Sequence, residues 1–71
     1  MKNTKVSIIV SEIILNRNGK FTLTDIINKS KPLIKNEFTT ENDLKNYVKY
    51  KLNSMCDLGL IGKTSLYYFS I

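Results

Sequence analysis

The sequence lacks the residues from which most small catalytic and metal sites are built. It contains no histidine and a single cysteine, and its six carboxylates are scattered along 71 residues. One chain therefore cannot supply a zinc site, a Cys-His or Ser-His catalytic pair, or a disulfide framework. No acid-base pair can be assembled from the remaining groups. The sequence predicts a protein that is not an enzyme and that binds no metal or cofactor.

Long hydrophobic runs are also missing. The longest apolar stretches, residues 6–10 and 13–15, are interrupted by Ser7 and separated by Ser11 and Glu12. Such stretches are too short to span a bilayer. Lys2 follows Met1, but no small-residue cleavage site comes after it, so the sequence shows no secretory signal. We therefore expect a cytoplasmic protein with no membrane association.

Proline occurs once and glycine three times, whereas 42% of the residues are hydrophobic and 24% are charged. This balance is typical of a folded chain and not of a disordered tail. A chain of this length buries only about 60% of the surface that its unfolded form exposes, so it holds one compact core. We expect one domain spanning residues 1–71.

The sequence contains fewer acidic than basic residues. Eleven Lys and Arg residues against six Asp and Glu residues give a net charge of +5 and an isoelectric point near 9.5. Residues 1–20 alone carry an excess of three positive charges. A basic protein favours an acidic partner, and nucleic acid is the commonest acidic partner in a cell.

The first predicted helix spans residues 4–16, where apolar side chains recur at helical spacing. Asn3 or Thr4 would cap it, and Gly19 suits the left-handed conformation just beyond a helix end. Two strands hinged near Ser11 are the alternative, because Ile and Val also favour sheets. The apolar stripe of this helix consists of Val6, Ile9, Val10, Ile13 and Ile14.

The second predicted helix begins after Thr22 or Thr24, because a threonine cap followed by the carboxylate of Asp25 is a helix start signal. It would bury Leu23, Ile26 and Ile27. A residue before proline is pushed out of helical space, so the helix should end near Ser30, or Pro32 should begin a separate turn carrying Leu33 and Ile34. Phe38 would then anchor the approach to the next element.

The third predicted helix begins at a capping box formed by Thr40 and Asp43 and ends at Gly59. Its buried stripe recurs at intervals of three and four residues and consists of Leu44, Tyr47, Val48, Leu52, Met55 and Leu58. Lys51 points toward the buried side and must extend its stem outward. Cys56 lies at the edge of the stripe and is interpreted as a core or boundary thiol. The opposite, polar face consists of Asn42, Lys45, Asn46, Lys49, Tyr50 and Asn53.

The chain is predicted to end in a β-hairpin. Leu60 and Ile61 start the first strand, residues 62–65 form the turn, and residues 66–71 form the second strand. Four aromatic residues in the hairpin and the third helix are expected to pack in the core and not to stack on nucleic-acid bases. These residues are Tyr47, Tyr67, Tyr68 and Phe69.

This order of elements, together with residues 47–61, resembles a winged helix-turn-helix domain over nearly the whole chain. Val48, Leu52 and Met55 would seat the third helix on the first two, and Gly59 would let the chain reverse into the wing. The resemblance implies an α+β, mainly α fold with three helices and a C-terminal β-hairpin wing.

In this family the exposed face of the third helix enters the major groove of DNA. The resemblance places Lys45, Asn46, Lys49 and Tyr50 in the groove, with Asn42 and Asn53 at its margins. Asn can bond adenine through two hydrogen bonds, and Lys can reach guanine or phosphate. Phosphate contacts are expected from Thr39, Thr40, Lys35 and Lys63. The alternative for the whole face is a solvated helix surface.

Ile8 and Leu15 lie seven residues apart on the face of the first helix opposite its apolar stripe. They predict a homodimer that pairs two DNA-binding helices. Alternatively, the N-terminus or the final strand covers them.

We therefore expect a small sequence-specific DNA-binding transcriptional regulator whose partner is double-stranded DNA. The alternative is a protein-binding inhibitor or adaptor on the same scaffold, such as a phage-encoded or mobile-element-encoded inhibitor of a host enzyme. Glu41, Asp43 and the short wing favour this alternative, because two carboxylates at the helix end oppose phosphate contact.

Overall fold

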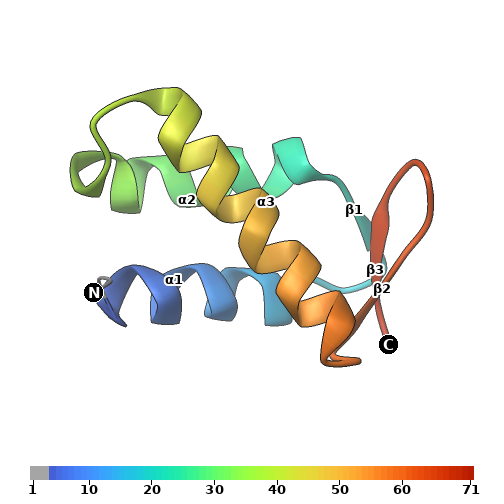
Figure 1. Ribbon diagram of the computed structural model, residues 1–71. Helices are drawn as coiled ribbons and strands as arrows, with labels where there is room; N and C mark the ends of the chain where they lie inside the picture. The colour runs from blue at the N-terminus through green and yellow to red at the C-terminus, as the bar shows by residue number, and fades with distance from the viewer. Residues whose placement is uncertain (1–3) are drawn as a thin grey trace.

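The computed structural model describes residues 4–71. These residues form three α-helices, a short 3-10 helix and a three-stranded antiparallel sheet, so the fold is α+β and mainly helical, as predicted (Figure 1). The elements in chain order are α1 Thr4–Leu15, β1 Lys20–Phe21, α2 Leu23–Ile34, η1 Lys35–Glu37, α3 Glu41–Asp57, β2 Ile61–Lys63 and β3 Tyr68–Ser70.

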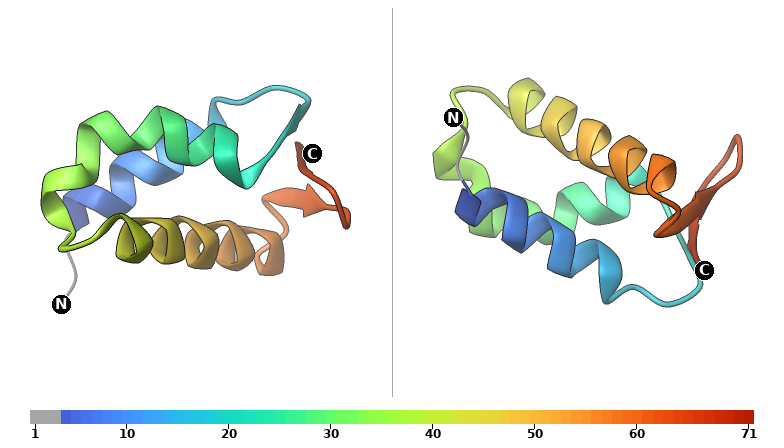
Figure 2. Two further views of the ribbon diagram at one scale, coloured as in Figure 1. Left: turned by 90° about the horizontal axis from the view of Figure 1, so that it is seen from above. Right: turned by 60° about the horizontal axis from the view of Figure 1, so that its bottom comes forward.

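Helix α3 crosses α1 and α2, which run in opposite directions, and the sheet lies beyond the last turn of α3 (Figure 1). Seen from above, α3 forms one side of the molecule and the other two helices form the opposite side (Figure 2). None of the helices between residues 4 and 71 combines the length and the apolar character needed to cross a membrane.

The core is formed where the three helices and the sheet meet. Helix α1 is a single helix and not two strands, and its stripe buries Val6, Val10 and Ile14, while Ile9 and Ile13 are half-buried. Of its two predicted caps, Asn3 and the side chain of Thr4 both lie outside the described residues. The buried apolar residues of the other elements are Phe21, Ile26, Ile34, Leu44, Val48, Leu52, Met55 and Ile61.

Helix α2 begins with a complete capping box. The Thr22 amide donates to Asp25 Oδ2 (2.9 Å), and the Asp25 amide donates to Thr22 Oγ1 (3.1 Å). This reciprocal pair satisfies two amides that a helix start otherwise leaves without a partner. Of the two threonines considered, Thr22 is therefore the cap.

The prediction that α2 ends near Ser30, or that a separate turn begins at Pro32, is wrong. The helix continues to Ile34 with Pro32 inside it. Proline removes a single amide donor there, and its exposed ring lies in the last turn. Continuing the helix places Ile34 in the core, fully buried, and this burial offsets the lost hydrogen bond. Leu33 remains exposed.

Helix α3 is capped at its start by Thr40, whose Oγ1 accepts from the Asp43 amide at 3.1 Å; this bond is the threonine half of the predicted capping box. Just beyond its C-cap residue, Gly59 adopts the left-handed conformation at φ 80°. The Gly59 amide donates to the Cys56 carbonyl and the Leu60 amide to the Met55 carbonyl, both at 3.0 Å. This pair of bonds is a Schellman motif, which ends the helix and turns the chain toward the sheet.

Leu58 is not part of the buried stripe, contrary to prediction, and is 71% exposed. The helix ends at Asp57, so Leu58 is the C-cap residue. Because the chain reverses at the next residue, the helical periodicity that predicted its burial no longer applies there.

The sheet is larger than the predicted hairpin. Its order is β1-β3-β2, and the unpredicted strand β1 pairs Lys20 with Phe69 and Phe21 with Tyr68. Gly19 has the predicted left-handed conformation (φ 77°), but it leads the chain into β1 and does not directly follow the helix. Its carbonyl accepts from the Ser70 amide at 3.1 Å.

The predicted turn of the hairpin is displaced along the chain. Gly62 and Lys63 belong to strand β2, and β3 is shorter than the predicted residues 66–71. The turn closes at Thr64, whose amide donates to the Tyr67 carbonyl (2.8 Å) and whose Oγ1 accepts from the Tyr67 amide (3.1 Å). A side-chain hydroxyl therefore closes the turn that glycine was expected to supply.

Candidate nucleic-acid interface

The predicted polar face belongs to α3, which lies on one side of the molecule with α1 and α2 on the other (Figure 2). It is exposed because Leu44, Val48 and Leu52 hold the opposite side of the helix in the core. Five of the six predicted residues are exposed and Asn53 is half-buried; the exposed ones are Asn42, Lys45, Asn46, Lys49 and Tyr50. We call these six residues the α3 polar face.

Lys63 lies beside the α3 polar face and not at the tip of the hairpin. It is the last residue of β2, and its Nζ donates to Asn53 Oδ1 at 3.4 Å. The tip is formed instead by residues 64–67. The structure therefore brings together two predicted site residues, Asn53 of α3 and Lys63 of β2. Lys63 places a positive charge near the C-terminal end of the α3 polar face.

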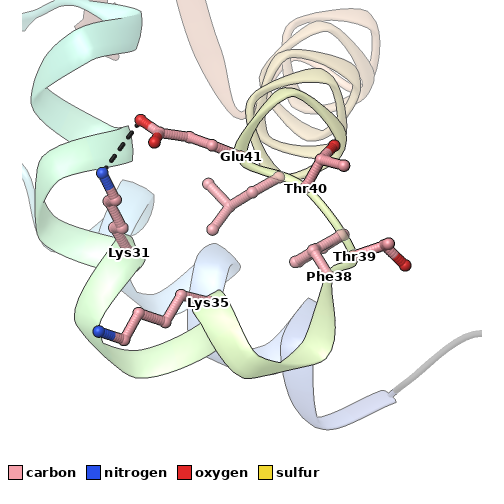
Figure 3. A pocket seen from close by; sticks show the side chains of 7 residues that line it. Lys31, Lys35, Phe38, Thr39, Thr40 and Glu41 are labelled. Atoms are coloured by element: carbon pink, nitrogen blue, oxygen red, sulfur yellow. Dashed lines mark ion pairs between the residues drawn. The ribbon is translucent and has the colours of Figure 1, made fainter.

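Three other predicted residues line one shallow hollow of about 220 Å³ at the N-terminal end of α3 (Figure 3). They are Lys35, Thr39 and Thr40, and Phe38 and Leu44 provide apolar walls. In Figure 3 the ammonium group of Lys35 and the hydroxyl group of Thr39 point to opposite sides, so they do not converge on one point. The Thr40 oxygen caps the helix. These residues form a broad edge and not a closed phosphate pocket.

The carboxylate of Glu41 is held by a cation from the neighbouring helix. Lys31 Nζ lies 3.0 Å from Glu41 Oε2, and both side chains are partly exposed (Figure 3). Lys31 was not among the predicted site residues, because α2 was expected to end near Ser30. This pair partly neutralises one of the two carboxylates that oppose phosphate contact. The other, Asp43, lies in the first turn, where the helix dipole favours a negative charge.

A row of aromatic rings supports Tyr50 at the edge of the α3 polar face. The ring centroids of Phe38 and Tyr47 are 5.6 Å apart, and those of Tyr47 and Tyr50 are 6.2 Å apart. Phe38 and Tyr47 pack against the core, which confirms the prediction for Tyr47, whereas Tyr50 is 65% exposed. The phenol of Tyr50 is therefore positioned by packing and is accessible to a partner.

The aromatic residues of the hairpin divide between the two faces of the sheet. Tyr68 stacks on the buried ring of Phe21 (centroids 6.0 Å apart) and packs against the core, as predicted. Tyr67 and Phe69 are half-buried and contact each other edge to face, and Lys20 Nζ lies 5.0 Å from the centre of the Tyr67 ring. The predicted core role therefore applies to Tyr68, while Tyr67 and Phe69 pack outside the core.

Lys51 does not contribute to the α3 polar face. Its Nζ donates to Ser7 Oγ of α1 at 2.7 Å, and both residues are half-buried. The side chain leaves the buried side as predicted and ends on the neighbouring helix. This hydrogen bond links α1 to α3.

Cys56 is half-buried, in agreement with its interpretation as a boundary thiol. Burial raises the pKa of the thiol above its ordinary value, and the nearby charge of Lys63 offsets only part of this effect. Burial also raises the pKa of Tyr68, with a smaller contribution from Cys56. Both groups are therefore held in their neutral forms.

The two residues predicted to form a dimer contact are accessible. Ile8 and Leu15 are each 54% exposed, so within residues 4–71 neither the final strand nor another segment covers them. The alternative in which the N-terminus covers them lies outside the described residues.

The α3 polar face offers ammonium, amide and phenol groups, which can donate to phosphate oxygens and to the acceptor atoms of base edges. Comparison of the chain with family models, curated proteins and solved structures found no match. The geometry and chemistry of the α3 polar face are therefore what indicates a function.

Proposed function

We propose that the protein is a small sequence-specific DNA-binding regulator of the winged helix-turn-helix type. The exposed α3 polar face carries this proposal, because its cations and amides lie on one side of a helix whose other side is buried. An α-helix about 10–12 Å across matches the width of the major groove of B-DNA, about 12 Å. The hairpin beyond the end of α3 serves as the wing (Figure 1).

The residues divide by chemistry into base readers and phosphate contacts. Asn46 bonds adenine and Lys49 bonds guanine acceptors from the middle of the face, with Lys45 and Asn42 at its N-terminal side. Tyr50 donates to a phosphate oxygen. The other phosphate contacts come from the two ends of the helix, from Lys35, Thr39 and Thr40 at one end and from Lys63 beside Asn53 at the other.

The regulator acts as a homodimer through α1. Ile8 and Leu15 lie two turns apart and are both half exposed, and Ser11 between them is small enough to allow a second helix to approach. Two-fold pairing places two α3 helices on half-sites about one DNA turn apart. Occupancy of an operator in the cytoplasm would then control transcription. A sedimentation experiment that shows only monomer at high protein concentration would contradict the proposed homodimer.

The test of DNA binding is selection of bound duplexes from a random pool at about 150 mM salt, followed by a salt titration of the selected duplex. We expect an enriched motif and a loss of about 1–3 kcal/mol per base contact in Asn46→Ala and Lys49→Ala. The matched control is Lys20→Ala, which removes the same charge from an exposed position on β1, outside the α3 polar face. A pool that shows no enrichment would contradict the proposal.

A second candidate is a protein-binding inhibitor or adaptor on the same scaffold. It is favoured by exposed apolar side chains close together in the sequence after α3, namely Leu58, Leu60, Leu66 and Ile71. Contact with a partner would remove this apolar surface from water. This candidate predicts a flat DNA titration and an identified protein partner that no longer binds Leu58→Ser and Leu66→Ser.

A further inference from the structure

A second hollow lies between the C-terminal end of α1 and the middle of α2. Its volume is about 270 Å³, and it is lined by Ile13, Asn16, Arg17 and Lys29. Seen from above, the chain that follows α1 lies on the far side of the molecule from α3 (Figure 2). The hollow is therefore separate from the α3 polar face.

Positive charge at this hollow is not neutralised by the protein. Among residues 4–71, neither Arg17 nor Lys29 forms an ion pair, and the described lining contains no carboxylate. Asp25, one turn before Lys29 on α2, is engaged at the helix start, where its Oδ2 accepts from the Thr22 amide. Arg17 is half-buried, so its side chain lies against the protein surface and does not extend freely into solvent.

We infer that this hollow binds a phosphate group. The planar guanidinium of Arg17 suits two oxygens of one phosphate, and Lys29 adds a second positive charge. The amide group of Asn16 can donate a further hydrogen bond. Ile13 provides an apolar wall against which the carbon part of a phosphate ester packs.

The size of the hollow limits the ligand to a compact one. Sites for drug-sized molecules occupy about 300–1,000 Å³, and this hollow is smaller. The shared chemistry is a phosphate monoester or diester, presented by a free small molecule or by a nucleic-acid backbone. The inference does not depend on the proposed DNA contact of α3, because it uses residues on the other side of the molecule.

The test is a titration of the amide NMR spectrum of the full chain, at constant ionic strength maintained with chloride. The probes are inorganic phosphate, a nucleoside 5′-monophosphate and a short DNA duplex. We expect saturable shifts at residues 13–17 and 28–30 for phosphate and, more strongly, for the monophosphate. Arg17→Gln and Lys29→Gln should weaken binding about tenfold, since each removes a charged hydrogen bond. Lys49→Gln, the matched control on α3, should leave these shifts unchanged.

Comparing the titrations with the three probes also identifies the source of the phosphate. If the duplex shifts residues 13–17 and Arg17→Gln abolishes those shifts, the source is a nucleic-acid backbone; otherwise a free ester is the ligand. Shifts that do not saturate, or that persist in both Arg17→Gln and Lys29→Gln, would overturn the inference. Each variant is checked for a native spectrum first, and Arg17→Lys, which keeps the charge without the planar fork, replaces Arg17→Gln if that variant unfolds.

Discussion

The ring of Phe69 lies directly over Gly62 on the neighbouring strand. The two residues are paired across β2 and β3, and a Cβ atom at position 62 would overlap the ring atoms Cζ, Cε1 and Cε2. Gly62 is therefore required by the close approach of a ring, although its backbone conformation is one that other residues can adopt.

Gly62→Ala should lower the free energy of unfolding by about 1–3 kcal/mol, because the methyl group must displace the Phe69 ring. Urea denaturation of Gly62→Ala, Phe69→Ala and the double variant measures this. In the Phe69→Ala background, Gly62→Ala should lower the free energy of unfolding by much less, because the ring is absent. Equal costs in the two backgrounds would show that the ring is not the cause.

Thr40 and Thr39 are adjacent but have different roles. Thr40→Ala should lower the free energy of unfolding by about 1 kcal/mol, because the Asp43 amide loses its capping oxygen. Thr39 is exposed, so Thr39→Ala should change stability by less than about 0.5 kcal/mol. If Thr39 contacts phosphate, its variant weakens DNA binding without loss of stability. Thermal unfolding of both variants gives the comparison, and equal destabilisation would contradict it.

Pro32→Ala should stabilise the protein by about 1–2 kcal/mol, because alanine supplies an amide donor inside α2 and has a higher helix propensity than proline. The gain is reduced by the greater freedom of the unfolded chain without proline. The exposed neighbour Leu33 serves as the control, and Leu33→Ala should be close to neutral. Chemical denaturation measures both, and a destabilised Pro32→Ala would mean that the ring makes a favourable contact.

Glu41→Gln should raise the affinity for the selected DNA a few-fold at low salt, because it removes a negative charge near the phosphates. Stability should change by less than about 1 kcal/mol, as expected for an exposed ion pair with Lys31. Glu12→Gln makes the same charge change on α1 and should have a smaller effect. Fluorescence anisotropy titrations at two salt concentrations test this, and unchanged affinity in Glu41→Gln would place the phosphates elsewhere.

Stability should fall at alkaline pH. Burial raises the pKa of the Cys56 thiol above its ordinary value of 9.0 and the pKa of Tyr68 above 10.0. The folded protein therefore holds these two protons more tightly than the unfolded chain does. This stabilisation is complete below about pH 9 and is lost as the pH rises through the folded-state pKa values.

Cys56→Ser tests the thiol contribution, because the hydroxyl does not ionise in this range. The difference between the free energies of unfolding of the native protein and the variant, measured in urea, should shrink or change sign between pH 8 and pH 10.5. A difference that stays constant across this range would show that the thiol does not contribute.

Short-range chemistry in the sequence determined that three helices form and which face of the third helix is polar. The spacing of Val48, Leu52 and Met55 decided which side of the third helix is buried, and the α3 polar face follows from it directly. Thr40 set the start of that helix and Gly59 its end, because a cap and a left-handed residue act within one turn.

The tertiary structure decided the features that depend on distant partners. Strand β1 has only two residues, which is too few to show the alternation of apolar and polar side chains that predicts a strand. It forms because it can pair with the edge of β3. Pro32 is tolerated inside α2 because Ile34 gains a place in the core. The contacts between Lys31 and Glu41 and between Lys63 and Asn53 join separate elements. Such contacts cannot be predicted from local sequence patterns, because the distance between the two residues depends on how the whole chain packs.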